Sequence, residues 1–126
     1  MNREDALQFC SRWLGAWTGN RPEELIGFYA EDAFYLDPAR PEGIKGRERM
    51  LAYFKKLLAA NPEWRWRALE VFPADKGFTL KWEAQVPVKG RELALRGLDI
   101  VEIKDGKITR NEVYFDRSEW IKLLKD

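Results

Sequence analysis

Residues 78–86 read FTLKWEAQV, in which apolar and polar side chains alternate at every position. Successive side chains of a β-strand point to opposite faces of a sheet, so this period of two predicts a strand with one buried face. The other face carries threonine, lysine, glutamate and glutamine, which is typical of an antiparallel sheet that covers a core on one side. Residues 78–86 therefore serve as the reference strand of a predicted antiparallel sheet.

Turn residues on both sides of this strand divide the C-terminal half into a series of strands. Residues 73–77 predict a turn, and the dipeptides Lys89-Gly90 and Asp105-Gly106 predict tight hairpins. The period of two continues between these turns. The predicted strands span residues 64–72, 78–86, 91–104 and 107–115. Their order predicts a meander.

In the N-terminal half the apolar residues recur at steps of three and four, which predicts amphipathic helices. Helices are expected over residues 3–18, over a short segment after Asn20, over residues 46–60 and, at the other end of the chain, over residues 118–124. Asn20 is expected to cap the short helix, with Glu23 in the reciprocal position. The apolar stripes of the first three helices comprise Leu7, Cys10, Trp13, Leu14 and Trp17; Leu25, Ile26 and Tyr29; and Met50, Leu51, Phe54, Leu57 and Leu58.

The segment between the second and third helices predicts little regular structure. Residues 33–37 predict a short strand that Pro38 ends, and residues 39–45 predict a loop. Because the helices are segregated from most of the strands, the pattern indicates an α+β fold. We expect one domain spanning residues 1–126, with amphipathic helices packed into the concave face of a curved, mostly antiparallel sheet.

The composition excludes several classes of function. The 22 basic and 21 acidic side chains are dispersed and leave a net charge of +1, so no nucleic-acid or anionic-membrane surface is expected. The absence of histidine excludes Ser-His-Asp and Cys-His catalysis and nearly all zinc sites, and we expect no metal and no cofactor. A single cysteine, no apolar run of membrane-spanning length and no signal-like N-terminus predict a cytoplasmic protein.

The strand over residues 91–104 places a carboxylate on its apolar face. That face comprises Leu93, Leu95, Gly97, Asp99, Val101 and Ile103. Aspartate is seldom buried without a partner, because burial in apolar surroundings favours its protonated form. Two interpretations stay open. In the first, a cation or a tryptophan N–H satisfies Asp99, or a bulge turns it outward. In the second, Asp99 is a functional acid in a pocket.

The other polar candidates have simpler interpretations. Asp37 precedes Pro38, and aspartate at this place is a common turn initiator. Glu83 and Glu112 lie among outward-facing neighbours and are interpreted as solvated surface. Cys10 lies on the apolar stripe of the first helix and is interpreted as inert core.

Residues 24–38 read ELIGFYAEDAFYLDP, and residues 97–108 read GLDIVEIKDGKI, with YFD at residues 114–116. These segments resemble the nuclear transport factor 2-like superfamily, which includes ketosteroid isomerases, SnoaL-like polyketide cyclases and limonene-epoxide hydrolases. The resemblance covers essentially the whole chain and implies a cone-shaped α+β barrel. It does not select an activity, because members with unrelated chemistries share these motifs.

The resemblance to ketosteroid isomerases implies roles for two carboxylates. Asp37 matches the general base of that family, which removes a proton next to a carbonyl, and Asp99 matches the acid that donates a hydrogen bond to the developing enolate. The family's catalytic tyrosine falls at Trp13, whose N–H can donate a hydrogen bond but cannot share a proton as a phenol can. The last aspartate of the epoxide hydrolases falls at Val113, which argues against hydrolysis by their mechanism.

Three functions remain open: an isomerase, cyclase or lyase for a small apolar carbonyl compound, a non-catalytic protein that binds such a ligand, and an interaction module whose pocket is filled by its own aromatic side chains. The pocket wall is expected to comprise Trp13, Trp17, Tyr35, Phe54, Trp82, Leu95, Val113 and Phe115. A homodimer is expected through the convex face of the sheet, where Leu98, Ile100 and Tyr114 point outward.

Overall fold

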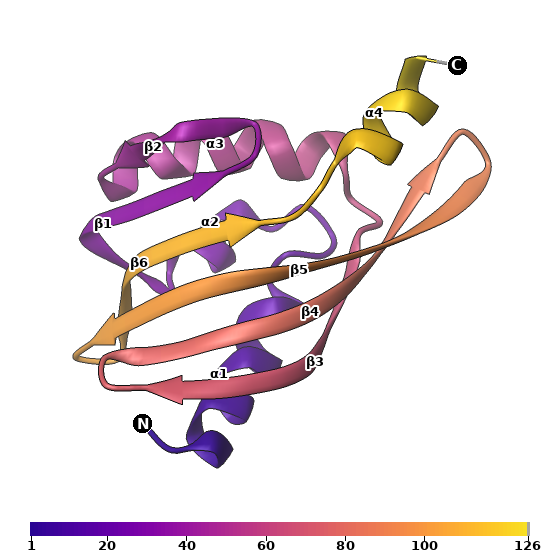
Figure 1. The fold of residues 1–126 in the computed structure, drawn as a ribbon. Helices are drawn as coiled ribbons and strands as arrows, with labels where there is room; N and C mark the ends of the chain where they lie inside the picture. Colours follow the sequence, from indigo (N-terminus) through magenta and orange to yellow (C-terminus); the bar gives the residue numbers. More distant parts are fainter. Residues whose placement is uncertain (126) are drawn as a thin grey trace.

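The computed structural model describes residues 1–125, in which six strands form one curved sheet (Figure 1). The strands lie in the order β2-β1-β6-β5-β4-β3. Every neighbouring pair is antiparallel except β1 and β6, which run parallel. The strands are β1 Tyr29–Asp37, β2 Arg40–Lys45, β3 Arg65–Ala74, β4 Gly77–Val88, β5 Arg91–Lys104 and β6 Lys107–Tyr114. The predicted meander corresponds to β3-β4-β5-β6.

Helices α1, α2 and α3 lie on the inner side of this sheet, and α4 stands beyond the end of β6 (Figure 1). α1 packs on β3, α3 packs on β1 and β2, and α2 lies against α3. The bounds are α1 Arg3–Gly15, α2 Pro22–Ile26, α3 Arg47–Ala60 and α4 Ser118–Lys125. The α+β fold class is thereby confirmed. Among the described residues no helix is long and apolar enough to cross a membrane.

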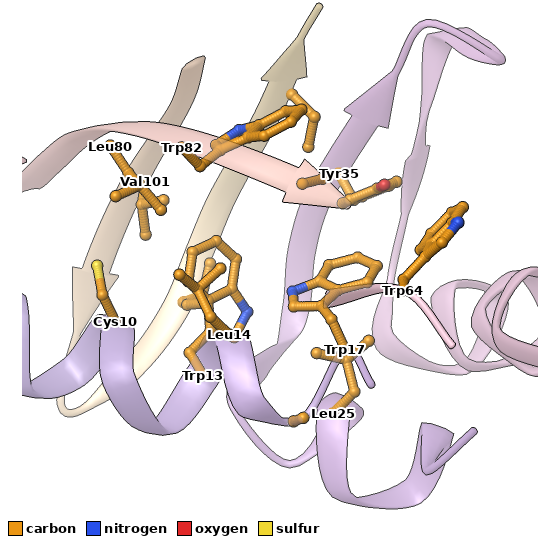
Figure 2. Close-up of a cluster of buried hydrophobic side chains, with 14 of the residues drawn as sticks. Cys10, Trp13, Leu14, Trp17, Leu25, Tyr35, Trp64, Leu80, Trp82 and Val101 are labelled. Atoms are coloured by element: carbon orange, nitrogen blue, oxygen red, sulfur yellow. The ribbon is translucent and has the colours of Figure 1, made fainter. Parts of the chain in front are cut away.

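The reference strand β4 has the alternation on which the fold prediction rests. Its inward side chains, each at most 1% exposed, are Phe78, Leu80, Trp82, Ala84 and Val86. In Figure 2, Leu80 of β4 and Val101 of β5 face Cys10 of α1. Sheet and helices therefore share one apolar core, and Cys10 is buried in it as expected.

The loop predicted over residues 39–45 is wrong, because most of this segment forms strand β2, which pairs antiparallel with β1. β2 lies at the edge of the sheet, and an edge strand tolerates Pro41 because one of its sides needs no ladder hydrogen bonds. Gly43 has φ of +84°, and a Cβ at that position would lie 2.3 Å from the ring of Phe34. The residues that predicted a loop thus allow an edge strand packed tightly on β1.

The short helix and the first apolar stripe also differ from the prediction. α2 is five residues long, so Tyr29 belongs to β1 and not to a helix. Asn20 has φ of 54° and does not cap α2, whose N-cap is Arg21. On α1, Leu7 is 44% exposed, whereas Phe9, absent from the predicted stripe, is buried. The buried side of α1 is therefore rotated away from Leu7.

Several elements end one to three residues away from their predicted ends. α1 ends at Gly15 and not at residue 18. β3 continues through Pro73 to Ala74, so its turn to β4 contracts to two residues. β3 is the second edge strand of the sheet, and this again explains why a proline does not end it.

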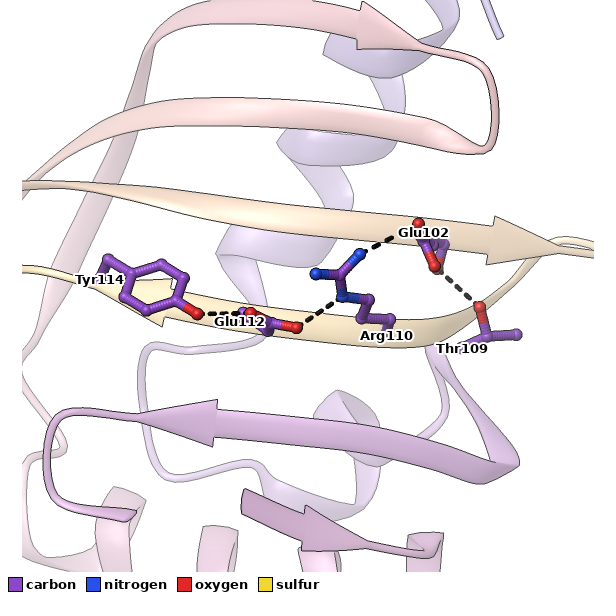
Figure 3. A network of polar contacts seen from close by, with 5 residues as sticks. All are labelled: Glu102, Thr109, Arg110, Glu112 and Tyr114. Atoms are coloured by element: carbon purple, nitrogen blue, oxygen red, sulfur yellow. Dashed lines mark hydrogen bonds and ion pairs between the residues drawn. The ribbon is translucent and has the colours of Figure 1, made fainter. Parts of the chain in front are cut away.

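The outer face of the sheet carries a network of paired charges (Figure 3). Arg110 of β6 forms ion pairs with Glu102 of β5 and with Glu112, and Tyr114 donates a hydrogen bond to Glu112. The Glu112 side chain is only 13% exposed. It points outward as predicted, but it is held by partners and is not freely solvated.

Glu83 of β4 has a similar arrangement on the same face. It accepts hydrogen bonds from Arg67 and Arg96, and its side chain is 11% exposed. Glu83 therefore also lies on the outer surface as predicted, but two arginines pair with it. Arginine stems from the neighbouring strands cover the carboxylate, a role that a strand pattern cannot predict.

Candidate functional site

A cavity of about 180 Å³ opens between the inner face of the sheet and α4. Both predicted carboxylates, Asp37 at the end of β1 and Asp99 on β5, line it. Its aromatic lining comprises Trp17, Tyr35, Tyr53, Trp64, Trp66, Trp82, Phe115 and Trp120. An apolar enclosure with few polar groups is the usual form of a small-molecule site.

Six of the eight residues expected in the pocket wall line this cavity. They are Trp17, Tyr35, Trp82, Leu95, Val113 and Phe115. Trp13 and Phe54 do not line it, because both are completely buried in the core. Phe54 packs edge-on against Trp17 and Tyr35, with ring centroids 5.2 and 5.1 Å apart. Trp13 lies one helical turn deeper than Trp17, and its indole N–H donates to the Tyr29 hydroxyl at 3.3 Å.

Several lining residues were not expected, although the sequence pattern could have revealed them. Trp64 and Trp66 have the same parity on one strand, opposite to the exposed Arg65 and Arg67, and this alternation alone places them inward. Trp64 and Trp66 pack edge-on, with ring centroids 5.5 Å apart. The apolar side of α4 also contributes Trp120, Ile121 and Leu124.

Asp99 is 5% exposed and is held by two N–H donors. Trp82 Nε1–H donates to Oδ1 at 2.7 Å, and Asn111 Nδ2–H donates to Oδ2 at 3.0 Å. Burial raises the pKa of Asp99 to about 7; the two donors oppose this rise, and the charge of Asp37 adds to it. Asp99 can therefore gain or lose a proton near neutral pH.

No cation among the described residues neutralises Asp99. Arg96 pairs with Glu83 on the outer face, and Arg110 pairs with Glu102 and Glu112 there. A tryptophan N–H does satisfy Asp99, as one of the two interpretations required, and the carboxyl group nevertheless faces the cavity. The tryptophan partner agrees with the first interpretation, and the position at the cavity agrees with the second, whose functional part stays a prediction.

Asn111 on β6 connects Asp99 to the core. Its amide oxygen accepts a hydrogen bond from the Tyr29 hydroxyl at 2.8 Å, and Tyr29 in turn accepts the N–H of Trp13. Burial raises the pKa of Tyr29 well above its usual range, so Tyr29 stays a neutral donor. An asparagine carries no charge, and nothing in its strand pattern marked Asn111 as part of a site.

Asp37 is 8% exposed and accepts four hydrogen bonds. Its Oδ2 accepts from the hydroxyls of Tyr35 and Tyr53, each at 2.7 Å, and its Oδ1 accepts from the backbone N–H groups of Ala39 at 2.9 Å and Arg40 at 3.0 Å. The backbone bonds fit the turn-initiating role, and the tyrosine bonds hold the carboxylate at the cavity. Burial and the proximity of Asp37 raise the pKa of both tyrosines, which therefore donate as neutral phenols.

The arrangement thus offers two carboxyl groups with different hydrogen-bond partners within one cavity. Asp37 accepts four hydrogen bonds, whereas Asp99 accepts two and has lone pairs left over. Among the described residues no group of three or more cysteine and acidic side chains lies close enough together to hold a metal ion. Any proton transfer at this site would run through the two carboxyl groups and the adjacent tyrosines.

Comparison with known proteins gives a family and a fold. A model of the SnoaL-like domain matches residues 10–111. None of the curated proteins compared with the chain matches it in sequence. Three solved structures are similar to this chain over nearly its whole length. Because their sequence identities to it are 21% or less, the similarity is evidence of a shared fold alone.

A hypothetical protein of ketosteroid isomerase-like fold from Catenulispora acidiphila, solved in complex with trimethylamine, has 21% identity and a TM-score of 0.81, covering 94% of this chain and 92% of its own. A proposed SnoaL-like polyketide cyclase from Shewanella putrefaciens has 13% identity and a TM-score of 0.81, covering 96% and 86%. TerC, crystallised with polyporic acid, has 14% identity and a TM-score of 0.79, covering 96% and 98%. These neighbours agree with the predicted cone-shaped fold.

Proposed function

Since the chain belongs to the SnoaL-like domain family, within the nuclear transport factor 2-like superfamily, we propose that it binds a small, mainly apolar carbonyl compound and moves a proton on it. The reaction would be that of an isomerase, cyclase or lyase. One observation carries the proposal: the buried carboxyl group of Asp99, whose pKa burial raises to about 7, lines an aromatic cavity that the carboxyl group of Asp37 also lines.

In the proposed reaction, protonated Asp99 donates a hydrogen bond to the carbonyl oxygen of the ligand. This bond strengthens as negative charge develops on that oxygen, so it stabilises the transition state more than the bound substrate. Asp37 removes the proton from the carbon next to the carbonyl and returns it to the same or another carbon. The reaction needs only side chains of this chain.

Asp37 can accept a proton only if one of its four donors leaves. Tyr53 is half-buried, whereas Tyr35 is 2% exposed, so the Tyr53 hydroxyl is the donor that a ligand can displace most readily. Displacement would free a lone pair on Oδ2, the oxygen that faces the two tyrosines. We propose that entry of the ligand and release of this hydroxyl are the same event.

A second candidate function is the non-catalytic binding of an organic cation. Aromatic faces and carboxylates attract ammonium groups, and among the described residues neither Asp37 nor Asp99 has an ion-pair partner. The similar protein from Catenulispora acidiphila was solved with trimethylamine. In this function Asp99 would be ionised when the ligand is bound, and no chemistry would follow.

The two functions predict opposite pH dependences of binding. A carbonyl ligand needs protonated Asp99, so its binding weakens as the pH rises through about 7, whereas an ammonium ligand binds more tightly over the same range. We would measure melting temperatures with cyclic ketones and lactones and with tetramethylammonium at pH 6 and pH 8, because a ligand that binds the native state raises the melting temperature.

Proton removal can be detected without knowing the product. Ketones that bind would be incubated with the protein in D2O, and NMR would follow loss of the signal from the protons next to the carbonyl. We expect Asp37→Asn and Asp99→Asn to abolish this exchange and Asp32→Asn, an exposed acid on the same strand as Asp37, to leave it unchanged. Binding without exchange in the unaltered protein would remove the catalytic proposal.

We also propose that two copies of the chain associate through the outer face of the sheet. Leu98 and Tyr114 on this face are 44% and 48% exposed, and they pair directly across β5 and β6. Exposed apolar side chains at the middle of a sheet are typical of a surface that a partner covers. A symmetric dimer would cover both residues in each copy.

A further inference from the structure

The polar side chains behind Asp99 form one continuous chain of hydrogen bonds through the core. Trp13 Nε1–H donates to Tyr29 Oη at 3.3 Å, Tyr29 Oη–H donates to Asn111 Oδ1 at 2.8 Å, and Asn111 Nδ2–H donates to Asp99 Oδ2 at 3.0 Å. Trp13, Tyr29 and Asn111 are all 0% exposed. None of these three residues lines the cavity, so none can contact a ligand directly.

Each link in this chain fixes the direction of the next. An indole N–H can only donate, so Trp13 occupies a lone pair of the Tyr29 oxygen. Tyr29 has one hydroxyl proton, which it gives to Asn111. The amide oxygen of Asn111 is thereby turned toward Tyr29 and its NH2 group toward Asp99. In the opposite orientation the NH2 group would face Tyr29, and the buried hydroxyl proton of Tyr29 would lose its acceptor.

The direction of the amide decides where a proton on Asp99 can lie. A reversed Asn111 could accept that proton and hold it inside the core, away from the cavity. With Asn111 donating to Oδ2 and Trp82 donating to Oδ1, the proton has no internal acceptor. Each carboxyl oxygen then keeps one lone pair without a donor, and Asp99 lines the cavity, where a ligand can reach it.

We propose that Trp13, Tyr29 and Asn111 are positioning residues, which keep Asn111 a donor to Asp99 and so direct the proton of Asp99 toward the bound ligand. The hydrogen-bond arrangement stands on its own, and only its consequence for catalysis rests on the proposed function. Because Asn111 lies 82 residues from Tyr29 in the sequence, the hydrogen bond between them joins two distant parts of the chain.

The other titratable groups near Asp99 do not provide this control. Burial raises the pKa of Cys10 on α1 to about 12 and that of Tyr29 on β1 well above its usual range, and the negative charge of Asp99 adds to both shifts. Both side chains therefore stay neutral near pH 7. Asp37 on β1 contributes a negative charge that favours protonation of Asp99 but has no direct bond to it. Within residues 1–125 only the N–H groups of Asn111 and Trp82 donate hydrogen bonds to the Asp99 carboxyl oxygens.

The first test uses the unaltered protein. Side-chain amide signals of Asn111 would be followed by ¹H–¹⁵N NMR together with the ¹³C signal of the Asp99 carboxyl group between pH 5 and 9. We expect both to titrate with one midpoint at about 7, and the two N–H signals of Asn111 to differ strongly because only one is bound to Asp99. An Asn111 signal that does not follow the Asp99 titration overturns the proposal.

The second test removes single links. Tyr29→Phe keeps the ring and frees the amide to rotate, so that it can accept the Asp99 proton, and we expect the Asp99 midpoint to rise by about one pH unit. Asn111→Leu removes the donor and should raise it as well. Tyr114→Phe, which removes a hydroxyl bonded to Glu112 on the outer face, is the matched control and should leave the midpoint unchanged.

The outcomes separate positioning from packing and from the proposed reaction. If the first two variants fold with a lower melting temperature but an unchanged Asp99 midpoint, the three residues are structural only, and the proposal is overturned. If the midpoint rises while the unaltered protein exchanges no proton with any ketone, the positioning stands and the proposed function fails. If Tyr29→Phe does not fold, Asn111→Leu and the amide titration decide.

Discussion

At the scale of single residues, Asp99 links protonation to stability. Its pKa in the folded protein is about 7, because burial outweighs its two N–H donors, whereas an unfolded aspartate titrates near 3.8. A group whose pKa is raised on folding stabilises the protein below its unfolded pKa, and this contribution is lost as the pH rises through the folded pKa. The stability of this protein should therefore fall between about pH 4 and pH 7.

Asp99→Asn tests this linkage, because the variant cannot ionise at that position. We expect the unaltered protein to lose free energy of unfolding, of the order of 4 kcal/mol over the full window, and the variant to show a much flatter profile. Urea unfolding at pH 4, 5, 6, 7 and 8 would measure it, with Asp32→Asn as the control. A flat profile in the unaltered protein would show that Asp99 is ionised throughout.

Tyr53→Phe tests whether the donors to Asp37 restrain it. Loss of a partly exposed hydrogen bond to a carboxylate should lower the free energy of unfolding by about 1 kcal/mol. The rate of deuterium exchange into a bound ketone should rise, because a lone pair on Asp37 Oδ2 becomes free. Tyr35→Phe frees the same oxygen from a fully buried partner and should cost more stability. Slower exchange in Tyr53→Phe would instead give its hydroxyl a direct part in the reaction.

Sequence alone predicted the direction of Asp99 but not its partners. The parity of β5 is strong because Leu95 and Val101 share the face of Asp99, so its inward direction follows from the strand geometry. Asn111 has the same inward parity on β6, yet an uncharged amide gives no chemical signal. The four donors to Asp37 come from β1, α3 and a turn, and no local pattern brings these together.

At the scale of elements, the sequence predictions were wrong where a strand lies at an edge of the sheet, because proline and glycine are tolerated there. Proline and glycine predicted a loop at β2 and a turn at the end of β3, but both strands lie at edges of the sheet, where these residues are tolerated. The interior strands β4 and β5 were predicted well, because one face of each is buried and its pattern is unambiguous. Which strands lie at the edges is a property of the sheet order and not of any segment.

Helix α4 is less buried against the rest of the fold than the other helices. None of its residues is fully buried, yet Trp120, Ile121 and Leu124 line the cavity. Trp120 packs edge-on against Trp64, with ring centroids 5.6 Å apart. We therefore interpret α4 as a cover whose main contacts are with the cavity wall and whose contribution to folding is small.

Trp120→Ala should separate these two contributions. We expect a loss of less than about 2 kcal/mol in the free energy of unfolding, since the side chain is only partly buried, and roughly a tenfold weaker affinity for the ligand. Calorimetry with the best ligand of the screen would measure the affinity, and Glu119→Ala, an exposed residue of the same helix, is the control. Unchanged affinity would mean that the bound ligand does not contact Trp120 of α4.

At the scale of the whole molecule, the outer face of the sheet is the surface on which a second copy would dock. Light scattering should give a mass twice the 14.8 kDa of one chain. Leu98→Lys places a charge at the centre of the proposed interface and should yield the single-chain mass, whereas Leu7→Lys, at an equally exposed leucine on α1, should not. A single-chain mass for the unaltered protein would remove the dimer.

The parallel pairing of β1 with β6 also determines when the site can come into existence during synthesis. β1 is the first strand of the sheet to be made, but its neighbour β6 is the last. Contacts between residues far apart in the sequence slow folding, because a long loop must close before they form. A nascent chain that has been made only as far as β5 therefore leaves one edge of β1 unpaired, and Asp99 acquires its Asn111 donor only once β6 has been made.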